Sequence, residues 1–316
     1  MKKLALALCI LGLSTGAGLA QDAEFIDEVP LVEAPETIGG TMNLSLGYLK
    51  GEAREFVYDP IGGDTISELI WDISAPILKG EIGADLFPWL SISVGGWTTV
   101  AKSDSVMDDY DYNQEYNGKL YTLHSHHDDT DLNFANEWEV ALKGWVLRDS
   151  NARGGLLMGY RESRYSWTAR GGTYDYYGFT GSFDAGVPGI GYRQMYFTPF
   201  LGLVAEANYG GFEFGARVRY SPAVKSNDRD NHYLRSLEFL DRGYSGTFFS
   251  LEGSMGYYFS EHVKAYVEGT YTAYKDLKGP TLYIDMDTQQ WDQSLGNSGG
   301  LQNKAYSISI GLQGKY

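Results

Sequence analysis

The sequence predicts an all-β fold: an antiparallel transmembrane β-barrel of about ten strands, with short periplasmic turns and long extracellular loops. Three observations predict it, namely an export signal, segments in which apolar and polar residues alternate, and connections that alternate between short and long. The 25 Tyr, 7 Trp and 40 Gly agree with it. So does a mean hydropathy of −0.29, because the wall of such a barrel alternates lipid-facing with lumen-facing residues and gathers aromatic rings at both interfaces.

Residues 1–20 read as a secretory signal peptide. A short basic start precedes the apolar run 4–13, and Gly-Leu-Ala at 18–20 has the small-x-small pattern of a cleavage site. The alternative, an N-terminal membrane anchor, is disfavoured because the run is shorter than the ~20 residues that span a bilayer. We therefore expect residues 21–316 to form the mature chain as a single domain.

Cysteine content and charge restrict the chemistry of the mature chain. Cys9 is the one cysteine and lies in the signal, so disulfides, thiol metal sites and a lipoprotein anchor are not expected. The whole chain carries −16; since Lys2 and Lys3 are the only charges of the signal, the mature part carries −18. This balance excludes nucleic acid as a partner. It fits cationic partners, or it serves only to keep the surface loops soluble.

Four segments show the two-residue period of a barrel strand. After an extended leader, 21–40, the mature domain opens at 42–48, and the period returns at 90–94, at 263–267 and at the C-terminal end. The last segment has the clearest alternation, with Tyr306, Ile308, Ile310, Leu312, Gly314 and Tyr316 on one face. Aromatic residues at both ends of an apolar face are typical of a strand in contact with lipid.

The connections alternate in length along the chain. Short turn sequences lie at 87–88, 149–151, 208–211 and 260–261. Longer polar segments lie at about 59–64, 104–130, 173–189, 222–244 and 276–302. This asymmetry is typical of outer-membrane barrels, and the runs between connections number about ten. A barrel of that size has an interior filled mostly by side chains, which argues against a general porin.

One polar segment contains three of the five histidines. His124, His126 and His127 are followed directly by two aspartates. Imidazole and carboxylate groups suit zinc or copper. However, the segment lacks a rigid i, i+4 spacing, and histidine clusters in surface loops are usually solvated. The sequence therefore favours no metal site.

Two short motifs could activate water. Asp109 and Asp111 project to the same side of an extended segment, and so do Asp230 and His232. A carboxylate beside a histidine orients the ring and makes it a plausible general base. Two neighbouring carboxylates can hold one water and share a proton, because adjacent like charges resist full ionisation. From the residues alone, both motifs are also compatible with solvated acidic faces or cation sites.

An ordered set of motifs covers nearly the whole mature chain. It comprises Gly96-Trp97-Thr98-Thr99, Asp109-x-Asp111, Leu132-Asn133-x-Ala135-Asn136-Glu137, Gly159-Tyr160-x-Glu162-Ser163-Arg164-Tyr165-Ser166, Thr168-Ala169-Arg170-Gly171-Gly172, Ile190-Gly191-Tyr192, Tyr220-Ser221, Asp228-x-Asp230-x-His232-Tyr233 and Lys264-x-Tyr266-Val267-Glu268-Gly269. With these motifs the chain resembles the omptins, outer-membrane aspartate/histidine endoproteases with a ten-stranded barrel. The resemblance implies a location in a Gram-negative outer membrane, with the active site facing the exterior.

The resemblance also implies catalytic roles. His232, paired with Asp230, would activate a water that Asp109 and Asp111 help to hold on the opposite side. The water would attack the scissile carbonyl directly, without an acyl-enzyme. Ser125 and His127 match a Ser-x-His pair at the rim of the site, with an auxiliary role.

Specificity for paired basic residues follows from the same resemblance. Glu55 and Asp228 match the acids of the pocket for Lys or Arg on the acyl side of the bond, and Met107 and Ile190 match its apolar walls. The implied substrates are cationic peptides or proteins. Where relatives place an acid near the rim serine, this chain has Leu123, which leaves the preference on the leaving side open.

A third set of residues concerns lipid. Tyr160, Glu162 and Arg164 match part of the lipopolysaccharide-binding site of the family, whereas Met195 replaces an expected arginine. The resemblance implies that lipopolysaccharide supports activity to an extent still open, that no other cofactor is needed, and that the chain is a monomer. Alternatively, Glu162 and Arg164 merely pair with each other on the barrel exterior.

Two other functions compete with the protease. A non-catalytic adhesin would use the acidic loops to bind cationic surfaces. A lipid hydrolase would need a Ser/His nucleophile, for which Ser125-x-His127 is the single candidate, in a loop beyond the membrane edge. The sequence does not identify the physiological substrate.

Overall fold

The computed structural model describes residues 39–316, and most of them lie in β-strands. The long strands are β1 (Gly39–Tyr58), β2 (Thr65–Phe87), β3 (Leu90–Thr99), β4 (Ser103–Tyr116), β5 (Lys119–Arg148), β6 (Ala152–Arg170), β9 (Pro188–Tyr209), β10 (Phe212–His232), β11 (Leu237–Tyr258), β12 (Val263–Gly279) and β15 (Gly299–Lys315). The short elements are β7 (Thr173–Tyr176), β8 (Phe179–Ser182), β13 (Thr281–Asp285), β14 (Trp291–Gln293) and the 3-10 turn η1 (Tyr233–Arg235). The predicted signal peptide, 1–20, and all but the last two residues of the leader lie outside the described residues.

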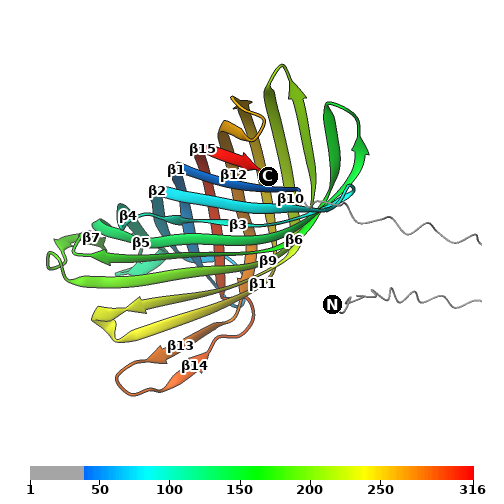
Figure 1. Ribbon diagram of the computed structural model, residues 1–316. Coiled ribbons are helices and arrows are strands. Elements are labelled where there is room, and N and C mark those ends of the chain that lie inside the picture. The colour runs from blue at the N-terminus through cyan, green and yellow to red at the C-terminus, as the bar shows by residue number, and fades with distance from the viewer. Residues whose placement is uncertain (1–38) are drawn as a thin grey trace, which may run out of the picture. The chain divides into compact units, whose positions relative to one another are not determined.

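The long strands close into a ring. They pair antiparallel in the order β1, β2, β3, β5, β6, β9, β10, β11, β12 and β15, and β15 pairs again with β1 (Figure 1). β4 prolongs β3, because both lie between β2 and β5. The ring therefore has ten strand positions, which confirms the predicted all-β antiparallel barrel. Within the described residues, no helix has the length and apolarity needed to cross a membrane.

The outer wall carries a belt of exposed apolar side chains. In the β1–β15 pair, Leu44 lies opposite Leu312 and Leu46 opposite Ile310, and each of the four is more than half exposed. Large apolar side chains would not face water in such numbers, so this belt contacts lipid. The alternation that predicted lipid-facing strands is thus confirmed in the first and last strands, β1 and β15.

The interior at the level of the belt is filled with ion pairs. Arg217 donates to both oxygens of Glu81 at 2.8 and 3.0 Å. Arg219 lies between Glu139 and Glu252, with N···O distances of 3.1 and 3.2 Å. Charged groups inside a protein require such partners. The predicted interior, filled by side chains instead of a wide pore, is confirmed.

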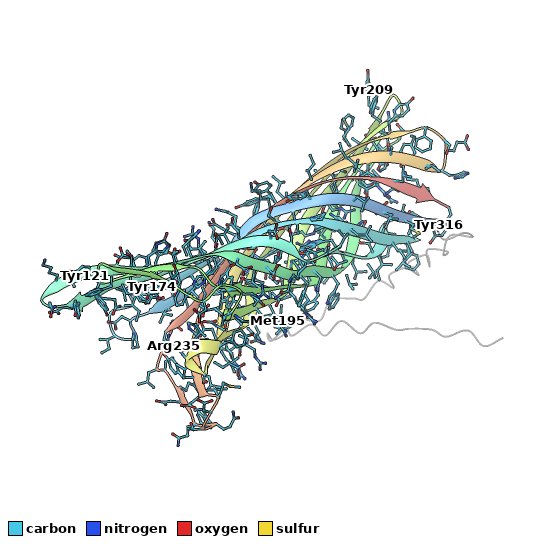
Figure 2. The ribbon with its side chains drawn as sticks, turned by 90° about the vertical axis from the view of Figure 1, so that its left-hand side faces the viewer. Tyr121, Tyr174, Met195, Tyr209, Arg235 and Tyr316 are labelled. Atoms are coloured by element: carbon cyan, nitrogen blue, oxygen red, sulfur yellow. The ribbon has the colours of Figure 1, made fainter. Side chains whose placement is uncertain are left out.

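The two ends of the barrel differ as the connection lengths predicted. Short turns join β2 to β3, β5 to β6, β9 to β10 and β11 to β12. Figure 2 shows Tyr209, beside one of these turns, and Tyr316 toward one end, with Tyr121, Tyr174 and Arg235 toward the other. We call the latter end, where the long connections lie, the mouth.

The long segments are more ordered than predicted. Most of 104–130 was expected to be a loop, but β4 and β5 continue through it and turn at Asn117-Gly118, whose φ angles are 51° and 72°. Strand pairing satisfies the backbone outside the membrane as well as inside it, and an Asn-Gly pair with positive φ favours a tight hairpin. Likewise, 173–189 holds the β7–β8 hairpin and 276–302 holds β13–β14. Within 222–244, β10 and β11 extend to either side of η1.

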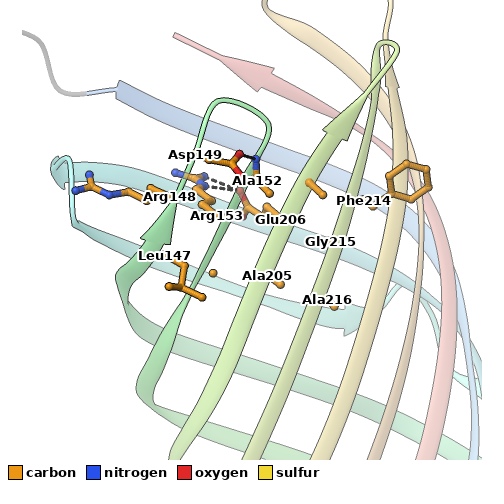
Figure 3. A pocket seen from close by; sticks show the side chains of 12 residues that line it. Leu147, Arg148, Asp149, Ala152, Arg153, Ala205, Glu206, Phe214, Gly215 and Ala216 are labelled. Carbon is orange, nitrogen blue, oxygen red and sulfur yellow. Dashed lines mark hydrogen bonds and ion pairs between the residues drawn. The ribbon is translucent and has the colours of Figure 1, made fainter.

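A shallow hollow lies on the wall at the opposite end from the mouth (Figure 3). Small residues such as Ala205 and Ala216 lie there beside the larger Leu147 and Phe214, next to the 149–151 turn. None of the predicted site residues lines it. The hollow is therefore not the site that the motifs predicted.

Candidate active site

The Asp–His couple, Asp230 and His232, lies at the mouth end of β10. The two residues are two positions apart on a strand, so both side chains project to one face. Nε2 of His232 lies 2.6 Å from Oδ2 of Asp230. The ring of Phe239 packs edge-on against the imidazole at 5.1 Å, and Ile190 lies opposite His232 on β9. Carboxylate and aromatic contacts together fix the orientation of the ring.

The electrostatics of His232 favour its protonated form. Burial disfavours the charged ring, but the charge of Asp230 and its hydrogen bond outweigh burial and raise the pKa of His232. The carboxylate therefore stabilises the imidazolium that forms when the ring takes up a proton, as a general base requires.

The Asp–Asp couple, Asp109 and Asp111, lies on β4. Burial and then the charge of Asp111 raise the pKa of Asp109 to about 7. The charges of His232 and Asp230 also act on Asp109, so the fold brings the two motifs within electrostatic range of each other. They come from strands that do not pair, and they meet because the strand ends surround one mouth.

Ser125 and His127 lie beside the Asp–Asp couple on β5. Ser125 is directly opposite Asp109 in the β4–β5 pair, and Leu123 is opposite Asp111. Nε2 of His127 lies 3.1 Å from Oγ of Ser125, and Phe183 stacks on the imidazole at 5.2 Å. Burial lowers the pKa of His127, which favours its neutral ring.

Glu55 and Asp228 meet a third acid, Asp241, which the sequence analysis missed. We call these three residues the acid pocket. Carboxylate oxygens of all three lie within 4.8 Å of one another. Asp228 accepts hydrogen bonds from the backbone N–H of Asp241 at 2.7 Å and from the hydroxyl of Tyr192 at 3.2 Å. Asp241 lies near the start of β11 without a motif around it, so only the β10–β11 register reveals it.

The acid pocket resists ionisation. Burial and the neighbouring carboxylates raise the pKa values of Glu55 and Asp228 well above their ordinary range. Burial also raises the pKa of Asp241 to about 7. A pocket of this kind holds protons when empty and gains most from a cation that replaces them.

An apolar floor and walls surround these acids. Trp71 stacks on Tyr192 with ring centroids 5.2 Å apart. Trp167 stacks on Tyr192 at 5.9 Å and packs at a tilt against Trp71 at 5.8 Å. Met107 is fully buried and Ile190 nearly so. This packing separates the mouth from the ion-pair network below and lowers the local dielectric, which strengthens charge interactions.

The unpaired carboxylate oxygens mark the mouth as a site. Within residues 39–316, four buried carboxylate oxygens lack a hydrogen-bond partner, and they belong to Glu55, Asp109, Asp230 and Asp241. A buried polar atom without a partner is costly, and folded proteins rarely keep one without a functional reason. All four belong to the Asp–Asp couple, the Asp–His couple or the acid pocket.

Comparison with known proteins assigns the family. The sequence model of the Omptin family matches residues 36–316. The chain belongs to the omptin family. This omptin is 35% identical to the plasminogen activator of Yersinia pestis over the full length of both chains. It is 37% identical to the outer membrane protease IcsP of Shigella flexneri, over 99% of this chain and 96% of that protein.

A solved structure agrees with this assignment. The crystal structure of the outer membrane protease OmpT from Escherichia coli matches with a TM-score of 0.85 and 36% identity, over 91% of this chain and 99% of that one. The omptin is thus an outer-membrane protein, and the names of its relatives support a peptidase.

The three residues matched to lipid binding lie apart from the mouth, on the outer face of β6. Tyr160 packs against Trp138 with ring centroids 5.5 Å apart. Nε of Arg164 donates to Glu162 at 2.7 Å, and Arg164 lies opposite Met195 on β9. The structure contains the pairing that the alternative interpretation expected. The Arg164 side chain is still about half exposed, so it can also contact a lipid headgroup.

Proposed function

We propose that this omptin is a cell-surface endopeptidase that cleaves between paired basic residues, using a water activated by the Asp–His couple opposite the Asp–Asp couple. The observation that carries the proposal is the set of unpaired buried carboxylate oxygens beside His232. These oxygens can serve both parts of the reaction. Those of Asp109 and Asp230 lie where a water would be held and activated, and those of Glu55 and Asp241 belong to the pocket proposed for a basic side chain.

The Asp–His couple supplies the base. Nε2–H of His232 donates to Asp230, which leaves the lone pair of Nδ1 free to accept a proton from water. As the water oxygen bonds to the scissile carbonyl carbon, one of its protons passes to Nδ1. The same proton can then reach the leaving amine when the C–N bond breaks, so no covalent enzyme intermediate is required.

The Asp–Asp couple holds the other side of the water. Oδ1 of Asp109 is buried and unpaired, and as a carboxylate it would accept a hydrogen bond from the second O–H of the water. This contact fixes the water before attack, and such positioning lowers the barrier without further chemistry. Ser125, opposite Asp109, would take an auxiliary place at the rim together with His127.

The acid pocket would bind the basic side chain on the acyl side of the bond. Glu55, Asp228 and Asp241 offer oxygens for a guanidinium or an ammonium, and charge-assisted hydrogen bonds are the strong ones. Met107 and Ile190 would contact the aliphatic stem. On the leaving side, Leu123 offers no charge, so recognition of the second basic residue would rest on the Asp–Asp couple.

Lipopolysaccharide is proposed as the lipid that supports activity. Tyr160, Glu162 and Arg164 form a polar patch on the outer wall, at a Trp138–Tyr160 contact typical of the membrane interface. Since Met195 adds no charge, we expect weaker dependence on phosphate groups than an arginine there would give.

A peptide library tests this proposal. With refolded protein and lipopolysaccharide, we expect cleavage after Arg or Lys, and a loss of kcat/KM of about 10- to 100-fold in Glu55→Gln and Asp228→Asn. Asp292→Asn, an exposed acid on β14, is the matched control. Tight binding of cationic peptides without any cleavage would reject the protease and favour the adhesin.

A further inference from the structure

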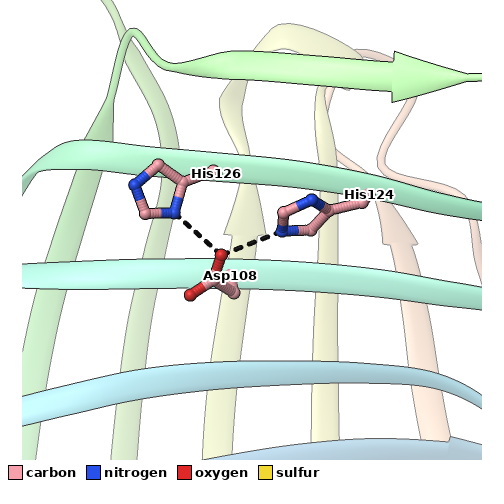
Figure 4. Close-up of side chains that lie close together, drawn as sticks. All are labelled: Asp108, His124 and His126. Carbon is pink, nitrogen blue, oxygen red and sulfur yellow. Dashed lines mark hydrogen bonds and ion pairs between the residues drawn. The ribbon is translucent and has the colours of Figure 1, made fainter.

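A second cluster of polar side chains lies on the outward face of β4, which carries the Asp–Asp couple, and of its partner β5. Asp108 of β4 and His124 and His126 of β5 converge there (Figure 4). Oδ1 of Asp108 lies 2.9 Å from Nε2 of His124 and 2.8 Å from Nδ1 of His126. We call these residues the outer triad.

Strand geometry builds the outer triad. His124 and His126 are two positions apart on β5, so their rings share one face, whereas Ser125 and His127 share the other. Asp108 lies directly opposite His126 in the β4–β5 pair and diagonal to His124. The polar composition of this segment predicted a solvated loop and therefore no metal site, whereas in the structure it forms two paired strands.

A neighbouring ring holds the geometry in place. Tyr110, directly opposite His124, stacks on its imidazole with centroids 4.4 Å apart and planes 8° from parallel. The three side chains remain about 30–40% exposed, at 28% for Asp108, 36% for His124 and 43% for His126. The cluster is therefore preorganised on one side and open to water on the other.

We propose that the outer triad binds a divalent transition-metal cation of the zinc class. Two imidazole nitrogens and one carboxylate oxygen, all within 4.8 Å of one another, are the ligand types that Zn²⁺ binds at ~2.0–2.2 Å. Small rotations of the three side chains would place them around one ion. Three protein ligands with an open face leave the fourth position to water.

The acid pocket does not compete for the same ion. It offers only carboxylate oxygens, which suit hard cations, and it is buried. The outer triad offers nitrogen ligands and access from solvent. Because successive residues of a strand face opposite sides, the two clusters are separated by the wall itself, and variants can remove one while leaving the other.

Zinc titration of the untagged, refolded barrel in detergent without lipopolysaccharide tests the proposal. We expect one Zn²⁺ per chain with micromolar or tighter affinity, weakened at least 10-fold in His124→Gln, His126→Gln and Asp108→Asn. Co²⁺ bound in place of Zn²⁺ should give a visible absorption band that the double His variant lacks. His262→Gln, at a short turn of the opposite end, should bind as the wild type does.

Heat-dependent gel mobility confirms that each variant is a folded barrel before titration. The proposal is overturned if the wild type binds no zinc at millimolar concentration. It is equally overturned if the double His variant binds as tightly as the wild type, or if Glu55→Gln and Asp228→Asn abolish binding while the triad variants keep it.

Discussion

Asp109 lies half-buried beside Asp111 at the mouth, and desolvation and the neighbouring charge raise its pKa to about 7. In its proposed role it accepts a hydrogen bond from water, and the ionised form is the stronger acceptor. His232 must be neutral to accept a proton, and its pKa is raised as well. Asp109 becomes ionised and His232 becomes neutral as pH rises, so both groups should increase activity in the same direction.

We therefore expect kcat/KM to fall as pH decreases through about 7. In Asp111→Asn the second cause of the raised pKa of Asp109 is removed, so the acid limb should move to lower pH, with lower activity overall. A pH profile of kcat/KM on one peptide measures both effects. An acid limb at the same pH in both proteins would show that Asp109 does not control it.

The third acid of the pocket leads to a second prediction. A substrate cation replaces the protons that the pocket holds, so KM should fall as pH rises through about 7, the pKa of Asp241. In Asp241→Asn we expect a flatter dependence of KM on pH and a KM raised about 10-fold at pH 8. kcat should stay within about twofold, because Asp241 is proposed to bind the basic side chain, whereas the hydrogen-bond partner of the base His232 is Asp230. A change in kcat alone would contradict the assignment.

The sequence could predict the two couples but not the third acid. Asp109-x-Asp111 and Asp230-x-His232 are visible because the period of a strand puts residues i and i+2 on one face. Asp241 joins Asp228 only through the register of β10 with β11, in which Asp230 pairs with Phe239. That register depends on where η1 reverses the chain, which no local pattern specified.

At the scale of elements, β11 and β12 approach closely beside the acid pocket. A Cβ on Gly279 would lie 1.8 Å from the backbone oxygen of Arg242, the residue after Asp241. Gly279→Ala should push β11 away, raise KM and destabilise the barrel by about 1–3 kcal/mol. Gly253→Ala, where a Cβ meets open space, is the control. The test is to measure the unfolding midpoint and KM of both variants. Equal midpoints and equal KM values would contradict the close approach of β11 and β12.

The sequence predicts the strands well where they contact lipid, because lipid requires an alternation of apolar and polar residues. It predicts the strand extensions outside the membrane less well. Ile308 and Ile310 face outward as the sequence predicted. Outside the membrane both faces of a strand can be polar, so β4 and the first part of β5 carry no apolar period. Their polar composition looked like a loop, although backbone pairing keeps them in strands.

Ion pairs across the interior stabilise the barrel as a whole. Arg219 is almost fully buried between Glu139 and Glu252, so Arg219→Met leaves two buried carboxylates short of a partner. We expect a loss of about 3 kcal/mol in urea unfolding, because removing one partner of a buried pair exposes the full desolvation cost. Lys304→Met, which breaks the exposed pair with Glu52, should cost less than about 1 kcal/mol. Similar losses in both would refute the structural role of the network.

The barrel thus divides three tasks among its outer wall, its interior and its mouth. The apolar belt holds it in lipid, the ion pairs fill its interior, and the extended strands carry the mouth beyond the membrane. A rigid wall explains how residues from β1, β4, β10 and β11 keep one arrangement although they are far apart in sequence.

Hydrolysis of an Arg-Arg peptide by His232→Ala and by His262→Ala tests the central claim most directly. Both variants should fold, because His232 projects into the mouth and His262 lies exposed at a short turn. If the Asp–His couple activates the water, His232→Ala loses about 10²- to 10⁴-fold in kcat, and His262→Ala matches the wild type. A folded His232→Ala protein that cleaves the peptide at the wild-type rate would contradict the account.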